Sequence, residues 1–236
     1  MDNVDRRSPA VSRTAFRVSA ALFALVMAFG GISGARAASA STAAALPPPS
    51  PGRQLITVTA DAYQRSTATL VAYTAENGRW VRTYGPWTAN VGESGIAPPG
   101  RKREGDGRTP SGTYGFDFMF GAKPDPGVRF PYRQARSHDK WDDDSASPLY
   151  NTWVDARHAD PGVSPENMLN PPAYDYGAVI AYNTGERTPH LGSAIFLHVN
   201  TGVPTSGCVS LPVDKLLKVL RWMDPKRSPR IDIRVA

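Results

Sequence analysis

The sequence predicts a mainly β domain with one helix near its C-terminus. The 236 residues include 22 Pro and 21 Gly, a share that favours turns and short strands over long helices. Most apolar stretches are short and either β-branched or alternating with polar residues, as in strands. One stretch has helical spacing, because Val213, Leu216, Leu217, Leu220 and Met223 follow each other at i, i+3, i+4, i+7 and i+10. This stripe predicts a helix over about 212–223.

The predicted strands can be read in chain order. Gln54–Ala60 alternates and is β-branched, and Thr67–Thr74 and Arg79–Tyr84 flank the turn residues Glu76-Asn77-Gly78, which predicts a hairpin. Residues 92–113 are rich in Gly and Pro and are expected to form a long loop. The remaining predicted strands are Tyr114–Phe120, Ala178–Tyr182, Ala194–His198 and Arg230–Val235.

The N-terminus has the pattern of an export signal. Several Arg residues precede an apolar run from Val18 to Ile32, and Ala35-Arg36-Ala37 follows it. Residues 1–37 are therefore predicted to be a signal peptide, with an uncleaved membrane anchor as the alternative. Residues 38–53 are rich in Ala, Ser and Pro and are predicted to be a linker. The folded domain is then expected over residues 54–236.

The charge of the chain gives no reason to expect a nucleic-acid partner. The net charge is +6, but without residues 1–37 the chain holds 22 basic and 19 acidic residues. No run of Lys and Arg interleaved with aromatic residues is present, so nucleic-acid binding is excluded as a function class. No contact with a membrane is expected beyond the signal segment, and the oligomeric state stays open.

The single cysteine, Cys208, excludes a disulfide framework and any multi-cysteine metal site. It follows Ser206-Gly207 and precedes the predicted helix, whose positive N-terminal end is expected to favour a thiolate. His198 ends a predicted strand ten residues earlier, and an imidazole there could take the thiol proton and return it to a leaving group. A catalytic Cys208–His198 pair is predicted, with a buried structural cysteine as the alternative.

Two segments carry a family resemblance. Ile195-Phe196-Leu197-His198 followed by Thr205-Ser206-Gly207-Cys208-Val209 resembles the signature of the L,D-transpeptidase (YkuD-type) catalytic domain. Upstream, Gly105–Tyr114 contains Thr109-Pro110-Ser111-Gly112, which is similar to the second marker of that family. The resemblance spans roughly residues 55–235.

The resemblance implies a β-sandwich or barrel-like catalytic domain that acts on peptidoglycan stem peptides outside the membrane, in the cell envelope or periplasm or extracellularly at the wall. It implies that Cys208 is the nucleophile, that His198 is the proton donor and acceptor, and that the Val199 carbonyl orients the imidazole. The N–H groups of Gly207 and Cys208 would stabilise the oxyanion. A cysteinyl acyl-enzyme would pass its acyl group to an amine, carbapenem-type β-lactams would be covalent inhibitors, and neither cofactor nor metal is expected.

The chain departs from the family pattern at two positions near the nucleophile. It reads Thr205-Ser206-Gly207-Cys208 where the common pattern is Ser-His-Gly-Cys, and Ser210 stands where many members carry Arg. Ser206 and Ser210 are candidate substrate-binding residues. The basic residues that could hold a substrate carboxylate instead are Arg101, Arg103, Arg108 and Arg187.

Residues 121–175 are too long for a simple connection and too aromatic to be disordered. This proline-rich segment is expected to pack over the Cys208–His198 cleft as a lid, with Trp141 and Trp153 as candidate substrate contacts. The alternative is an insertion that packs on the far side of the domain.

Other functions remain open or are disfavoured by the motifs. A carboxypeptidase or hydrolase that uses the same pair, and a non-catalytic wall-binding module, are the alternatives that remain. The Ser-x-x-Lys match at Ser137–Lys140 lacks the companion motifs of penicillin-binding enzymes. A metal peptidase site from His138, His158 and His190 with Asp142–Asp144 has no matching ligand spacing. Papain-like peptidases place Cys before His, the reverse of the order here.

Overall fold

The computed structural model describes residues 53–236. The predicted signal peptide, residues 1–37, and all but the last residue of the predicted linker lie outside the described residues. Within residues 53–236, no helix is long and apolar enough to cross a membrane.

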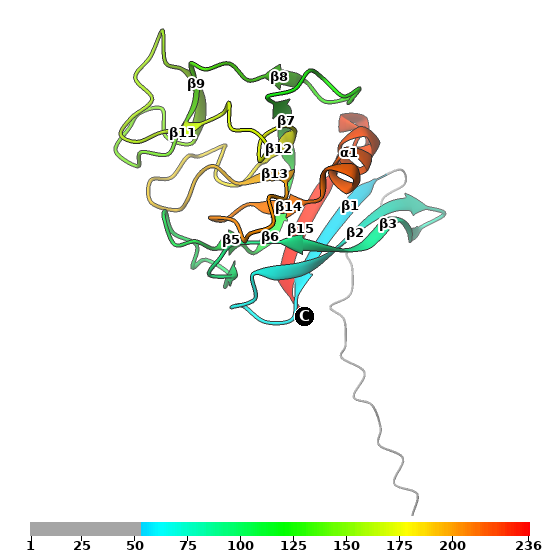
Figure 1. The fold of residues 1–236 in the computed structure, drawn as a ribbon. Helices are drawn as coiled ribbons and strands as arrows, with labels where there is room; N and C mark the ends of the chain where they lie inside the picture. The colour runs from blue at the N-terminus through cyan, green and yellow to red at the C-terminus, as the bar shows by residue number, and fades with distance from the viewer. Residues whose placement is uncertain (1–52) are drawn as a thin grey trace, which may run out of the picture. The chain divides into compact units, whose positions relative to one another are not determined.

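The described residues form one large mixed sheet, two small sheets and one α-helix (Figure 1). The large sheet has the order β6 (Gly112–Tyr114), β15 (Arg230–Val235), β1 (Gln54–Ala60), β2 (Thr67–Glu76), β3 (Arg79–Asn90), β14 (Val209–Leu211), β13 (Phe196–Val199), β12 (Gly177–Ile180), β7 (Phe116–Gly121), β8 (Tyr132–Gln134). The small sheets are β10 (Thr152–Asp155), β9 (Asp139–Asp142), β11 (Glu166–Asn167), and β4 (Ile96–Ala97) with β5 (Thr109–Pro110). The predicted mainly β class is confirmed.

The predicted helix is confirmed as α1 (Val213–Trp222), which is followed by a 3₁₀ turn at Pro225–Arg227. The helix follows Pro212, whose fixed φ suits the start of a helix. Its buried residues Leu216, Val219 and Leu220 join one hydrophobic core with the strands. Leu216, Leu220 and Met223 of the predicted stripe are buried, whereas Val213 is exposed and Leu217 half-buried, so the face that attaches α1 to the sheet is only partly the predicted one.

The N-terminal hairpin is confirmed, but its second strand is longer than predicted. The turn places Asn77 and Gly78 at φ of 48° and 72°, as a two-residue hairpin turn requires. β3 continues past Tyr84 to Asn90, and its register with β2 shifts near Leu70 and Ala72. These irregularities accommodate Pro86, which has no N–H for a regular ladder and which concealed the continuation in the sequence.

Alternating residues of β13 face two different cores. Leu197 and Val199 belong to the cluster that contains the helix residues. Phe196 belongs to a second cluster, in which Cys208 packs with aromatic residues. Since successive strand residues point to opposite faces, the fold separates a helix-covered face from a face that carries the cysteine.

Most of the segment 121–175 packs on this second face, as predicted, whereas Val128, Phe130 and Tyr132 pack with the helix-containing cluster. Trp141, Met168 and Tyr174 from the segment share the cluster with Phe196 and Cys208. The segment is more regular than expected, because it contains β8 and the whole β10–β9–β11 sheet. The expectation of an unbroken loop over 92–113 was wrong, because this stretch holds β4, β5 and most of β6, and the predicted strand 114–120 is interrupted at Gly115.

Candidate active site

Two neighbouring parallel strands bring Cys208 and His198 to one cavity. In the register of β13 and β14, Leu197 lies opposite Val209 and His198 opposite Ser210, so Cys208 lies next to Phe196. Phe196 and His198 are two residues apart and share a face of the sheet. Both Cys208 and His198 line a cavity of about 340 Å³. The cavity is also lined by Lys102, Glu104 and Gly105 and by Asp143, Glu166, Ala173 and Tyr174 of the 121–175 segment. Residues of the turn before the cysteine complete this part of the lining: Thr201, Val203, Pro204, Thr205 and Ser206.

His198 is buried, with 8% of its surface exposed. Its Nδ1 lies 2.9 Å from the Val199 carbonyl oxygen, which is the contact that the resemblance predicted. A carbonyl oxygen can only accept, so Nδ1 carries the proton and Nε2 carries the lone pair. Burial lowers the pKa of His198, while the carbonyls of Val199 and Ala173 act in the opposite direction. The imidazole is therefore neutral near pH 7 and can accept a proton at Nε2.

Cys208 is also buried, with 7% exposed. Its Sγ accepts from the Phe196 N–H at 3.3 Å and donates to the Ala194 carbonyl at 3.3 Å. Burial raises the pKa of the thiol, and the nearby charge of Glu166 adds to that effect. The Phe196 N–H and Lys102 lower it only in part. The resting side chain is a neutral thiol, which needs a base to take its proton during attack.

The expectation that the N-terminal end of the helix favours a thiolate at Cys208 was wrong. Cys208 precedes the strand β14, and α1 begins only at Val213. The influence of a helix end falls off within its first turn, so it contributes little at the sulfur. The strand between Cys208 and the helix could not be predicted from the sequence, because Val209-Ser210-Leu211 is too short to show the alternation of a strand.

Two threonine hydroxyls hold the backbone of the nucleophile. Thr205 Oγ1 donates to the Cys208 carbonyl at 2.7 Å, and Thr109 Oγ1 donates to the same oxygen at 3.2 Å. Thr109 Oγ1 also accepts from the Gly92 N–H at 2.8 Å, and the Gly207 N–H donates to Thr205 Oγ1 at 3.2 Å. Gly207 must therefore exchange this partner before its N–H can stabilise an oxyanion. Sequence reasoning singled out Thr109 as part of a marker but not for this contact.

A side chain at position 207 would be both strained and crowded. The φ of Gly207 is +149°, and an added Cβ would lie 3.0 Å from the Arg108 carbonyl oxygen and 3.3 Å from Ile195 Cδ1. The turn can approach residues 108 and 195 this closely only because residue 207 is glycine.

We expect Gly207→Ala to lower the free energy of unfolding by about 1–3 kcal/mol, the usual cost of a strained backbone position. Urea unfolding followed by tryptophan fluorescence measures it. Gly185→Ala is the matched control, because Gly185 has no atom within 4 Å of an added Cβ. Equal stability of the two variants would contradict the close packing of this turn.

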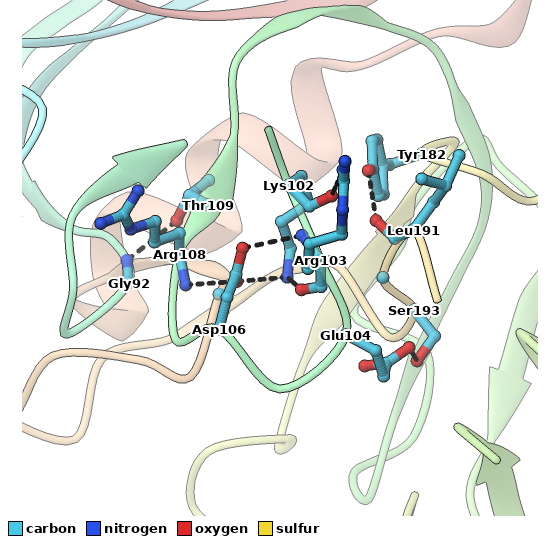
Figure 2. A network of polar contacts seen from close by, with 12 residues as sticks. Gly92, Lys102, Arg103, Glu104, Asp106, Arg108, Thr109, Tyr182, Leu191 and Ser193 are labelled. Atoms are coloured by element: carbon cyan, nitrogen blue, oxygen red, sulfur yellow. Dashed lines mark hydrogen bonds and ion pairs between the residues drawn. The ribbon is translucent and has the colours of Figure 1, made fainter. Parts of the chain in front are cut away.

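The loop of residues 102–108, from which Lys102, Glu104 and Gly105 line the cavity, is organised around Asp106 (Figure 2). Its Oδ1 accepts from Lys102 Nζ at 2.7 Å and from the Arg108 N–H at 2.9 Å, and its Oδ2 accepts from the Arg103 N–H at 2.8 Å. One carboxylate thus fixes the loop and binds Lys102, the only Lys or Arg side chain in the described lining of the cavity.

Acidic groups outnumber basic groups in the described lining. Glu104 accepts from Ser193 Oγ at 2.8 Å and from the Tyr150 hydroxyl. Burial raises the pKa of Asp143 to about 6 and that of Glu166 to about 7. The candidate carboxylate binders Arg101, Arg103, Arg108 and Arg187 are all outside this lining. Sequence reasoning noted the run Asp142–Asp144 but had no signal for Glu166, Lys102 or Tyr174.

The predicted substrate-binding residues are not all brought together. Ser206 lines the cavity, whereas Ser210 is buried in β14 outside the lining. Trp141 and Trp153 lie in the aromatic cluster behind it, where their indole N–H groups donate to Asn151 at 3.0 Å and to Asp139 at 3.1 Å. The structure gives both indoles a packing role, and a contact with substrate stays a prediction. The aromatic residue that lines the cavity from this segment is Tyr174.

The histidines considered for a metal site, His138, His158 and His190, do not line the cavity of Cys208 and His198. His138 and His158 each approach Asp155 at 3.8 Å. In the part of the chain that the structure describes, no group of three or more His, Cys, Asp or Glu side chains could hold a metal ion.

Comparison with known proteins gives one match. A family model described as the L,D-transpeptidase catalytic domain (YkuD) matches residues 58–233. No curated protein and no solved structure matches the chain. The matched region contains both Cys208 and His198, with the strands that bring them together.

Proposed function

The chain belongs to the L,D-transpeptidase (YkuD) catalytic domain family, and from this membership we propose that it is a cysteine-dependent acyltransferase acting on peptidoglycan stem peptides. The observation that carries the proposal is the shared cavity of Cys208 and His198, with His198 Nδ1 held by the Val199 carbonyl. A binding module without catalysis would need neither a buried thiol nor a neutral imidazole oriented in this way.

Acylation follows from the protonation states of the pair. The thiol of Cys208 is neutral because of its burial, so its proton moves to His198 Nε2 as Sγ attacks the carbonyl carbon of the donor stem. The carbonyl oxygen becomes an oxyanion, which the Cys208 N–H, and the Gly207 N–H once released by Thr205, would stabilise. Collapse breaks the C–N bond, and Nε2 returns the proton to the amine of the leaving D-alanine. A thioester on Cys208 remains.

Transfer uses the same groups in the opposite direction. The amine of an acceptor attacks the thioester carbon and gives its proton to His198 Nε2. The C–S bond then breaks, and the thiolate recovers the proton from the imidazole. Water as the acceptor would give hydrolysis, so the choice between transferase and carboxypeptidase depends on which nucleophile enters the cavity.

The proposed location is outside the cytoplasmic membrane, where peptidoglycan is found. The basic and apolar pattern of residues 1–37 supports export, and the Ala/Ser/Pro-rich residues 38–53 would separate the domain from the membrane or pass through the wall.

Exposure of the purified protein to a carbapenem should add the mass of one carbapenem to the intact chain. The reason is that the strained lactam carbonyl is a substrate for any activated thiol in this cavity, and opening of the ring leaves no departing group. Mass spectrometry of the intact protein measures the adduct, and peptide mapping should locate it on Cys208. Protein unfolded in urea is the control, since its thiol lacks His198. A native protein that remains unmodified would contradict the proposal.

A further inference from the structure

A hydrogen-bonded pair from the 121–175 segment lies in the wall of the active-site cavity. The Tyr174 hydroxyl donates to the carboxyl group of Glu166, and both side chains line the cavity together with Cys208 and His198. Glu166 is in β11, and Tyr174 precedes β12. Tyr174 is 4% exposed, so its ring is part of the packed wall and not a surface group.

The ring of Tyr174 packs against three other rings. It meets the His198 imidazole edge to face, with centroids 5.3 Å apart and an interplanar angle of 83°. It contacts Phe196 and Phe120 in the same manner, each at 5.6 Å. Edge-to-face contacts of this kind have a preferred geometry, so the tyrosine ring restricts the orientation of the imidazole.

The backbone beside Tyr174 is tied to the group that holds His198. The Val199 N–H donates to the Ala173 carbonyl at 3.1 Å, while the Val199 carbonyl accepts from His198 Nδ1. The segment therefore contacts the imidazole directly through the ring of Tyr174 and is linked to it through Val199, whose N–H donates to Ala173 and whose carbonyl holds Nδ1.

We propose that Tyr174, anchored by Glu166, is a positioning residue that holds the His198 imidazole in the orientation needed for proton transfer with Cys208. The proposal rests on the proposed function of the pair. Groups that orient a catalytic imidazole are usually carboxylates or carbonyls; here the carbonyl of Val199 fixes one ring nitrogen and the tyrosine ring fixes the plane.

Protonation of the anchor determines the conditions of the test. Burial raises the pKa of Tyr174, so its hydroxyl stays a donor. Burial and Asp143 raise the pKa of Glu166 to about 7, whereas the hydrogen bond from Tyr174 lowers it. When Glu166 is ionised, its negative charge raises the pKa of the Cys208 thiol further. At pH 6 Glu166 is mostly neutral, so Glu166→Gln then changes neither the charge nor the acceptor oxygen.

The test is the rate constant of carbapenem acylation at pH 6, measured at saturating and at subsaturating carbapenem. Tyr174→Phe keeps the ring and removes the anchor; we expect its saturating rate to fall by about 10–100-fold, with unchanged half-saturation. The saturating rate of Glu166→Ala should fall by the same factor, and that of the Tyr174→Phe/Glu166→Ala double variant should fall no further. The saturating rate of Glu166→Gln should stay within about threefold of the parent. Tyr63→Phe and Glu76→Gln, at exposed positions outside the cavity, are the controls.

A second readout does not require acylation. The ¹⁵N shifts of the His198 ring, assigned with a His198→Asn variant, report how the proton is shared between Nδ1 and Nε2. Tyr174→Phe should move the parent ring from Nδ1-protonated toward a mixture of the two tautomers. Parental acylation and parental shifts in Tyr174→Phe would overturn the positioning role. If the parent itself is never acylated, the proposed function fails, while the shifts still decide whether Tyr174 orients the ring.

Discussion

Cys208→Ala is expected to abolish acylation and turnover while the protein stays folded. The sulfur is the only atom in the cavity that can form the thioester, so the loss should reach the detection limit of the assay, about 10⁴-fold or more. The substitution removes one atom from a buried site, which costs about 1 kcal/mol of stability. Intact mass after carbapenem treatment measures acylation, and thermal unfolding measures stability.

Cys208→Ser is the matched variant for this prediction. It places a smaller hydroxyl where the thiol was, and this hydroxyl can use the contacts with the Phe196 N–H and the Ala194 carbonyl. It should also be inactive, because a serine hydroxyl is a much weaker nucleophile with the same neutral base. Activity retained in folded Cys208→Ala protein would remove Cys208 from the mechanism.

The elements with a local period could be predicted from the sequence. The strand Gln54–Ala60 was predicted with the bounds of β1, and the stripe beginning at Val213 gave the helix. Both signals are repeated several times within one element. The elements missed were short: β4 and β5 have two residues each, and a period cannot be seen in two residues. They are strands only because Ile96 and Thr109, distant in the chain, lie side by side.

In the candidate site too, some residues could be predicted from the sequence and others could not. Cys208 and His198 could be predicted because they lie in a motif whose residues are close together in the chain. The opposite wall could not, since Glu166 and Tyr174 meet the motif only through the packing of the 121–175 segment. The same packing places Trp141 behind the cavity, where its ring contacts Phe196 with centroids 5.0 Å apart. The sequence identified the aromatic segment, but only the fold shows which of its rings lines the cavity.

Protonation states were also beyond the sequence. The position of Cys208 before a helix favoured a thiolate, but the burial of the thiol and the charge of Glu166 have the opposite effect. The larger effect belongs to burial, because transfer of a charge from water into a packed interior costs more than a distant helix end returns. A neutral thiol would make the proposed acylation dependent on a base.

That dependence gives the second large prediction. His198→Ala should lower the rate constant of carbapenem acylation by about 10²–10⁴-fold, the range that a general base contributes. His158→Ala is the control, since His158 is an exposed histidine, with 76% of its side chain accessible. Stopped-flow fluorescence or time-resolved intact mass gives the rates. Equal rates for the His198 and His158 variants would exclude the imidazole as the base.

The pH profile separates the loss of a base from a general disturbance of the site. In the parent, acylation requires neutral His198, whose pKa burial places below its ordinary value of 6.5, so the rate should reach its plateau by about pH 7. In His198→Ala the only nucleophile is the thiolate, and burial holds the thiol pKa far above its usual range. The rate of the variant should therefore keep rising about tenfold per pH unit through pH 9. A flat profile in the variant would mean that another group takes the thiol proton and that the Cys208–His198 pair does not act as a unit.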